Sequence, residues 1–145
     1  MKPGLGAVFG TPSIREMDGD DYGDFPLRRF LSMDIEDVEP GHAIARLEVG
    51  DELLNPNGVV HGGVLFTMAD TAMGKATMTS LEKGQFCASI EIQMRFLRPV
   101  SAGTLVADTS VIRRGLRVVH LESRILDAHG ELVATAAGTF AVISP

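Results

Sequence analysis

The sequence contains little cysteine: Cys87 is the only one among its 145 residues. A single cysteine cannot form a disulfide within the chain or supply a cysteine-rich zinc site, and a reducing cytoplasm is therefore the expected compartment. The four histidines lack metal-ligand spacing, so we expect no metal. No run of 18 apolar residues occurs, and the first residues do not resemble a secretory signal peptide, so we expect no membrane-spanning segment.

Positive charge is also scarce, because 13 lysines and arginines are outnumbered by 19 aspartates and glutamates, giving a net charge of −6. Nucleic-acid binding depends on a basic surface, so we expect no nucleic-acid partner. The charge is uneven, however, since residues 91–124 contain six arginines and three acidic residues. That segment could bind a small anionic ligand. The sequence motifs of serine hydrolases, P-loop nucleotide binders and dinucleotide binders are absent.

Hydrophobic periodicity predicts one long helix and a set of strands. Residues 1–24, rich in glycine and aspartate, are expected to form a flexible arm, and residues 25–145 one domain. Residues 64–80 contain no proline and are apolar around most of the helix circumference, which is typical of a buried helix. Alternation of apolar and polar residues predicts the strands. The predicted strands are residues 34–40, 42–49, 88–96, 104–113, 118–127 and 131–143, with a short helix at 25–33 and hairpin loops at 114–116 and 128–130.

The fold class predicted from these elements is α+β, with the long helix lying across the concave side of a curved antiparallel sheet. The last strand, residues 131–143, is apolar on both faces. We therefore expect that strand to be central in the sheet or covered on both sides.

The segment that carries chemistry joins a loop of turn-forming residues to the long helix. Gly62 and Gly63 stand at the helix start, where backbone N–H groups lack helical partners and carry partial positive charge. Such an end can polarise a carbonyl group. Asp70, the only carboxylate of the helix, lies roughly 10 Å further along the axis, whereas catalytic contacts need about 3 Å. If both groups act on one substrate, they should come from two chains in a twofold pair, which predicts an obligate dimer with a composite site.

Each of these residues also has an ordinary structural interpretation. Asp70 belongs to a stripe of small and polar residues that could face water. His61 could be a loop or core histidine, and Asn55 could be a turn residue. The sequence by itself leaves these alternatives open.

Taken together, the segment resembles the hot-dog-fold acyl-CoA thioesterases of the phenylacetate-pathway (PaaI-like) type. The shared pattern is Asn-x-x-Gly-x-x-His-Gly-Gly, six residues, Asp, and a glycine four residues later, and residues 55–74 fill every position. The resemblance covers about residues 30–143. Its further segments are residues 89–99, 113–115, 130–134 and 138–140. It implies a hot-dog fold, in which a curved sheet wraps one long helix, and hydrolysis of acyl-CoA to free acid and CoA with no cofactor besides the substrate.

The resemblance also implies roles for individual residues. Asp70 would be the general base or the nucleophile, and Gly62 the N–H donor to the oxyanion. Asn55 would position water, His61 would lie beside the thioester, and Ser89 would support the acid or the water. Asp70 and Ser89 would come from one subunit, and the other three residues from its partner. We expect a homodimer, with dimers pairing further.

Candidates for the contacts with CoA are Gly63, Arg113, Arg114 and Arg117, although the hairpin arginines could simply be solvated. Phe66, Met73, Met94 and the N-terminal segment are candidates for the acyl pocket, which side chains of two subunits would form. Gln93 could alter the shape of this pocket, since the family often has asparagine at that position. Two other functions are conceivable. One is a non-catalytic acyl-CoA-binding protein, and the other is an enoyl-CoA hydratase or dehydratase, which typically pairs histidine and acid at a different spacing.

Overall fold

The structure, a computed structural model, describes residues 23–145. The predicted flexible arm, residues 1–24, lies outside the described residues except for its last two. The elements in chain order are α1 (Pro26–Phe30), β1 (Asp34–Glu39), β2 (His42–Val49), a 3-10 turn η3 (Asp51–Leu53), α2 (Gly62–Thr79), β3 (Phe86–Phe96), β4 (Gly103–Arg114), β5 (Val118–Leu126) and β6 (Leu132–Ile143). Within residues 23–145, no helix combines the length and the apolar character needed to cross a membrane.

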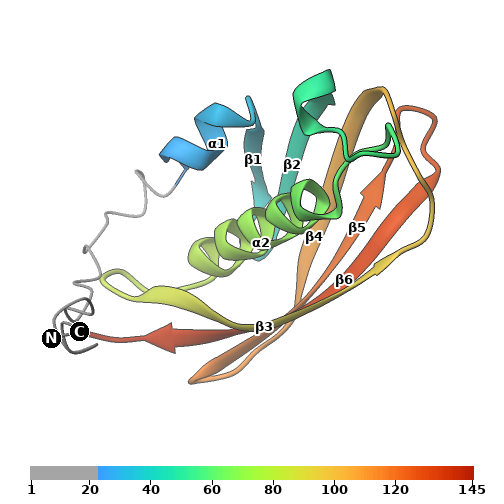
Figure 1. The fold of residues 1–145 in the computed structure, drawn as a ribbon. Coiled ribbons are helices and arrows are strands. Elements are labelled where there is room, and N and C mark those ends of the chain that lie inside the picture. Colours follow the sequence, from blue (N-terminus) through green and yellow to red (C-terminus); the bar gives the residue numbers. More distant parts are fainter. Residues whose placement is uncertain (1–22) are drawn as a thin grey trace, which may run out of the picture.

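The six strands form one antiparallel sheet in the order β1-β2-β4-β5-β6-β3. Figure 1 shows the sheet curving around α2, which crosses its concave face. The predicted α+β fold class is therefore confirmed. β6 lies between β5 and β3, as expected from its two apolar faces.

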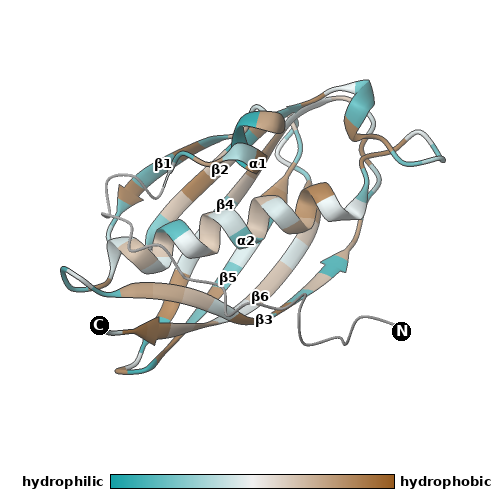
Figure 2. Cartoon of the chain, turned by 60° about the vertical axis from the view of Figure 1, so that its left-hand side comes forward, coloured by the Kyte–Doolittle hydropathy of each residue, from teal (hydrophilic) through white to brown (hydrophobic). Residues whose placement is uncertain are grey.

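The core lies between α2 and the sheet. The buried residues of α2 include Leu65, Met68, Ala72 and Met73, each 5% exposed or less. Figure 2 shows apolar residues, in brown, along the strands that α2 crosses. Because alanines fill many of the facing positions, the helix can lie close to the strands.

Two predicted element bounds shift for identifiable reasons. The predicted helix at residues 25–33 ends at Phe30, since Ser32 takes a left-handed φ of 49° and turns the chain into β1. The long helix begins at Gly62 rather than at residue 64, because His61 acts as its N-cap.

β3 is an edge strand of the described sheet. It pairs with β6 on one side, and no strand of residues 23–145 pairs with its other side. The strand has 11 residues and carries exposed apolar side chains at Ile90 (59%) and Phe96 (58%). A long edge strand with exposed apolar side chains is a surface at which another strand can pair.

Gly138 of β6 lets the helix approach the sheet. A Cβ at this position would collide with Sδ of buried Met73 and lie 3.2 Å from its Cε. We expect Gly138→Val to lower the free energy of unfolding by about 1–3 kcal/mol through overpacking, measured by urea denaturation. The matched control is Ala137→Val, one residue away on the exposed face, with an expected change below about 0.5 kcal/mol. Equal effects of the two substitutions would contradict this account of the packing.

Candidate active site

The start of α2 leaves one backbone donor without a partner. Nδ1 of His61 accepts the Gly63 N–H at 2.8 Å, and the His61 carbonyl accepts the Val64 N–H at 2.9 Å. Accepting this bond requires Nδ1 to carry no proton, which assigns the neutral Nε2–H tautomer. Within the described part of the chain, the Gly62 N–H meets no acceptor. Gly62, rather than Gly63, therefore remains able to donate to a ligand.

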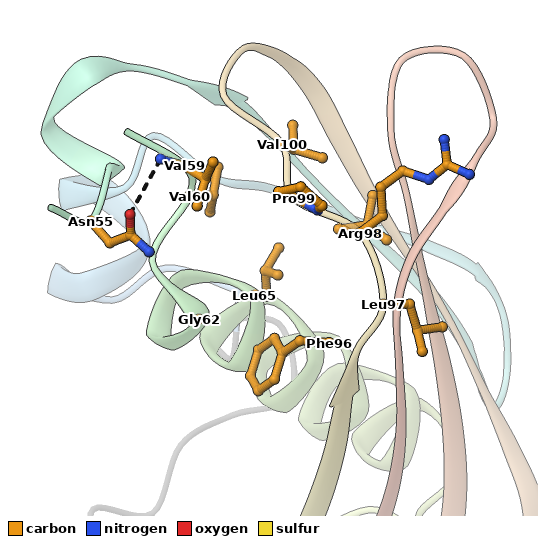
Figure 3. Close-up of a pocket in the computed structure, with 11 residues that line it drawn as sticks. Asn55, Val59, Val60, Gly62, Leu65, Phe96, Leu97, Arg98, Pro99 and Val100 are labelled. Atoms are coloured by element: carbon orange, nitrogen blue, oxygen red, sulfur yellow. Dashed lines mark hydrogen bonds between the residues drawn. The ribbon is translucent and has the colours of Figure 1, made fainter. Parts of the chain in front are cut away.

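Asn55 is oriented by the turn that precedes α2. Its Oδ1 accepts the N–H groups of Asn57 (2.9 Å) and Val59 (3.3 Å). These two donors identify which side-chain atom is oxygen, so the amide NH₂ is directed away from the turn. Figure 3 shows this nitrogen on the side of the loop that leads into α2. The turn therefore holds Asn55 as a hydrogen-bond donor near Gly62.

Asn55 and Gly62 line one cavity of about 310 Å³, which we call the Gly62 cavity. Its walls come from the loop before α2, the first turn of α2, the end of β3, the segment after β3 (Figure 3) and the start of β6. Phe96 lies against Gly62, where an added Cβ would be only 3.0 Å from the ring. Among the lining residues, Arg98 is the only charged one. Its guanidinium extends away from the cavity in Figure 3, and its Nη2 lies 3.4 Å from Oε2 of Glu131.

Asp70 and Ser89 line a second cavity of about 470 Å³, which we call the Asp70 cavity. Its lining residues come from the start of α1, one side of α2, the start of β3 and β6. They are Phe25, Leu27, Phe66, Thr67, Asp70, Thr71, Cys87, Ala88, Ser89 and Phe140. The two cavities share no lining residue.

The Asp70 carboxylate is half-buried, and burial raises its pKa above the ordinary value of 3.8. No residue of the described chain forms a hydrogen bond or an ion pair with it. Asp70 is therefore partly withdrawn from solvent, and its carboxylate oxygens remain open to water or to a ligand in the cavity. A carboxylate with a raised pKa holds a proton more tightly and is a stronger base.

Ser89 faces α2 because β3 contains a bulge. The strand pairs with β6 through Ser89↔Phe140 and Glu91↔Thr139, so Ile90 is an extra residue. In a regular strand, Ser89 and Ile92 would point to opposite faces. Here both lie on the helix side, since Ser89 lines the Asp70 cavity and Ile92 packs against the core. The bulge thus turns Ser89 toward Asp70 without displacing Ile92.

The predicted site residues therefore form two groups within one chain. Asn55, His61 and Gly62 lie at the start of α2, and Asp70 and Ser89 lie beside its middle. Asp70 follows Gly62 by eight positions, or about 12 Å along the helix axis. One chain does not bring the two groups together.

The predicted arginines lie at the other end of α2, in and beside the turn between β4 and β5. Arg114 donates from Nε to the Ser80 carbonyl at 2.9 Å and from Nη2 to Oε1 of Gln85 at 3.2 Å. The bond to Ser80 attaches Arg114 to the C-terminal end of α2, where a cation is favourable, and the bond to Gln85 attaches it to the loop that follows. Arg113 and Arg117 are exposed.

Three further positions differ from their expected surroundings. Phe66 lines the Asp70 cavity, but Met73 and Met94 do not, because Met73 is fully buried in the core and Met94 packs against it. Gln93 lies on the opposite face of the sheet from α2 and donates to Glu91 at 2.6 Å. The lining residues Phe25, Leu27 and Arg98 had no signal in the local sequence pattern, since their places depend on tertiary packing.

Comparison with known proteins agrees with this architecture. The model of the thioesterase superfamily matches residues 57–134. A 1,4-dihydroxy-2-naphthoyl-CoA hydrolase of Listeria monocytogenes is 29% identical over 80% of this chain and 94% of its own. A thioesterase structure from Haemophilus influenzae has a TM-score of 0.78 at 26% identity and covers 81% of this chain and 82% of its own. The E. coli PaaI protein from the phenylacetic acid degradation operon has a TM-score of 0.80 at 27% identity and covers 86% and 89%.

The fold and these matches define a thioester hydrolase built on the hot-dog fold, in which one long helix lies within a curved antiparallel sheet. The chain belongs to the thioesterase superfamily. The resemblance to PaaI-like thioesterases seen in the sequence is thereby confirmed.

The raised pKa of Asp70 predicts a cost in stability that depends on pH. Because the pKa is higher in the folded chain, ionisation opposes folding; the cost is absent below 3.8 and develops as the pH rises through the folded-state pKa. We expect Asp70→Asn to unfold at higher urea concentration than the wild type at pH 7, with the difference disappearing toward pH 3.5. Exposed Asp34, replaced by asparagine, is the control and should show no such gain. An unchanged or lower midpoint for Asp70→Asn at pH 7 would contradict the burial argument.

Proposed function

We propose that this protein hydrolyses acyl-CoA thioesters to free acid and CoA at sites shared between two copies of the chain. Each site would combine the Gly62 cavity of one copy with the Asp70 cavity of the other. The observation that carries this proposal is the separation of the oxyanion donor and the carboxylate into two cavities with no common residue. The hydrolase from Listeria supports the substrate class, since its name specifies a CoA thioester.

Edge strand β3 supports the arrangement of the two copies. The start of β3, at Ser89, lines the Asp70 cavity, and its end, at Phe96, lines the Gly62 cavity. Antiparallel pairing of β3 with the β3 of a twofold-related copy places the start of each strand beside the end of the other. The Asp70 cavity of one copy then meets the Gly62 cavity of its partner at both ends of the pair. The exposed apolar side chains of the edge would become buried.

The chemistry follows from the groups that such a pair assembles. The Gly62 N–H donates to the thioester carbonyl oxygen and stabilises the negative charge that develops there. The side-chain NH₂ of Asn55 and the Ser89 hydroxyl hold a water molecule. Asp70 accepts a proton from this water as its oxygen attacks the carbonyl carbon. The carbon–sulfur bond then breaks, the acid is released, and the CoA thiolate takes up the proton.

A covalent route uses the same residues. In this route the carboxylate of Asp70 attacks the carbonyl carbon, expels the CoA thiolate and forms an anhydride, which water hydrolyses. After a single turnover in ¹⁸O-labelled water, label in Asp70 would establish the covalent route, because only attack of water on the Asp70 carbonyl of the anhydride places it there. Both routes require the carboxylate.

Asp70→Asn is expected to lower kcat for acyl-CoA hydrolysis roughly 10²–10⁴-fold, as removal of a general base does. Release of the CoA thiol, followed with a thiol reagent, measures the rate, and Asp34→Asn serves as the control. The corresponding change in the Gly62 cavity is Asn55→Asp. This substitution keeps the oxygen that accepts the N–H groups of the turn and removes the NH₂ donor. It should also lower kcat. Full activity of Asp70→Asn, or binding of acyl-CoA without turnover by the wild type, would contradict the proposal.

The shared site has a sharper consequence when the two variants are combined. A mixed dimer of Asp70→Asn and Asn55→Asp chains contains one doubly altered site and one unaltered site. Random reassociation of equal amounts makes half of the dimers mixed, so about a quarter of the wild-type activity should return. If each site lay within one chain, mixing would restore nothing.

Arg98 is the cation that we expect to contact the CoA phosphates, since it is the only charged residue lining the Gly62 cavity. Arg98→Gln should raise KM for acyl-CoA about fivefold, which corresponds to about 1 kcal/mol for an exposed charge pair. It should leave KM unchanged for the same acyl group on N-acetylcysteamine, which lacks phosphates. Arg46→Gln is a matched control, because Arg46 is also exposed and paired with a glutamate. A rise in KM for Arg113→Gln or Arg117→Gln but not for Arg98→Gln would favour the hairpin arginines instead.

A further inference from the structure

One wall of the Asp70 cavity comes from a part of the chain that is distant in sequence from the candidate catalytic residues. Phe25 and Leu27, at the start of α1, line the cavity together with Phe66 of α2 and Phe140 of β6. Leu27 is 49% exposed and Phe66 is 39% exposed, so apolar surface on both sides remains open to a ligand. No other residue of α1 lines the cavity; Phe30, on the same helix, is 74% exposed and does not.

The position of this wall is fixed by the residues that follow it. Leu31 and Met33 are 7% and 2% exposed and belong to the core, and they anchor α1 beside β1. Arg28 connects the two ends of the segment, because its guanidinium donates to the carbonyl of Met33 at 2.8 Å and to the carbonyl of Gly23. Leu31 N–H donates to the Leu27 carbonyl at 3.0 Å. Phe25 and Leu27 are therefore held over the cavity by the fold itself.

The arrangement of polar and apolar side chains determines how an acyl group would be oriented in the Asp70 cavity. Its polar side chains, Thr67, Asp70, Thr71 and Ser89, come from α2 and β3, and the reacting carbonyl must lie beside Asp70. The carbons of the acyl group then have the apolar remainder of the cavity to occupy. Burying them against Leu27 and the phenyl rings removes apolar surface from water. An acetyl group offers only one methyl carbon to these contacts.

We propose that Phe25 and Leu27 form the wall of the acyl subsite and select for bulky apolar acyl groups over acetyl. This inference rests on the proposed function and adds the class of acyl group to it. The selecting residues lie in the segment before β1, outside the loop, helix and strand that carry the candidate catalytic groups.

The test compares acetyl-CoA, hexanoyl-CoA and benzoyl-CoA as substrates of Leu27→Ala and Phe25→Ala. We expect kcat/KM for hexanoyl-CoA or benzoyl-CoA to fall about tenfold or more, the effect of removing contacts in an apolar pocket, and for acetyl-CoA to change less than twofold. Leu27→Trp, which fills the cavity, should also lower kcat/KM for the bulky substrates selectively. Phe30→Ala is the matched control, because it removes a larger apolar side chain from the same helix outside the cavity. Its selectivity should equal that of the wild type.

The outcomes separate this inference from the proposed function. Selective loss with hexanoyl-CoA, with benzoyl-CoA or with both supports the subsite and shows which shape it prefers. An equal fall with all three substrates, or the same selectivity change in Phe30→Ala, would overturn it, since a merely structural role of α1 acts on every substrate. If the wild type hydrolyses none of the three, the proposed function fails. In that case, the Kd values of hexyl-CoA and ethyl-CoA thioethers test the subsite, and equal Kd values would overturn it.

Discussion

The proposed site depends above all on the rigid length of α2. Gly62 and Asp70 belong to one unbroken helix, and their separation along its axis is about 12 Å, whereas attack on a carbonyl requires partners about 3 Å apart. Rotation about side-chain bonds cannot close that gap, and a well-packed helix does not bend to close it. In the proposed mechanism, the Gly62 N–H and the Asp70 carboxylate would therefore meet at one carbonyl only when a second copy supplies one of them. The proposed catalysis therefore depends on how two copies of the chain assemble.

Edge strand β3 connects that constraint to the fold. Its two ends line the two cavities, so in the proposed dimer a single twofold operation on this strand would complete two sites at once. The bulge at Ile90 is part of the same arrangement, because it places Ser89 and Ile92 on the same face of the strand. Ser89 can thus line the cavity while Ile92 packs in the core. In a strand without a bulge, only one of the two side chains would point toward α2.

The sequence predicted the features that depend on local pattern. The helix was evident from its apolar circumference, the central place of β6 from its two apolar faces, and the separation of Gly62 from Asp70 from the helix rise. Tertiary placement was beyond such patterns. Phe25 and Leu27 lie more than 40 residues from Asp70, Arg98 reaches the Gly62 cavity from the segment after β3, and Arg114 binds the end of α2. Gln93 faces away from α2 because β3 alternates, and the bulge that sets this phase has no distinctive residue.

The start of α2 shows how the fold could make a single donor effective. A helix start usually presents several unpaired N–H groups to solvent. Here His61 occupies the Gly63 N–H with its ring nitrogen and the Val64 N–H with its carbonyl, which leaves the Gly62 N–H as the donor with a defined direction. The Phe96 ring lies against Gly62, and a Cβ there would push it away. An apolar ring beside the donor limits the access of water, and a hydrogen bond in such surroundings is stronger than one in bulk solvent. The absence of a Cβ at Gly62 thus permits this close packing, and in the proposed mechanism it would also let a thioester approach the backbone.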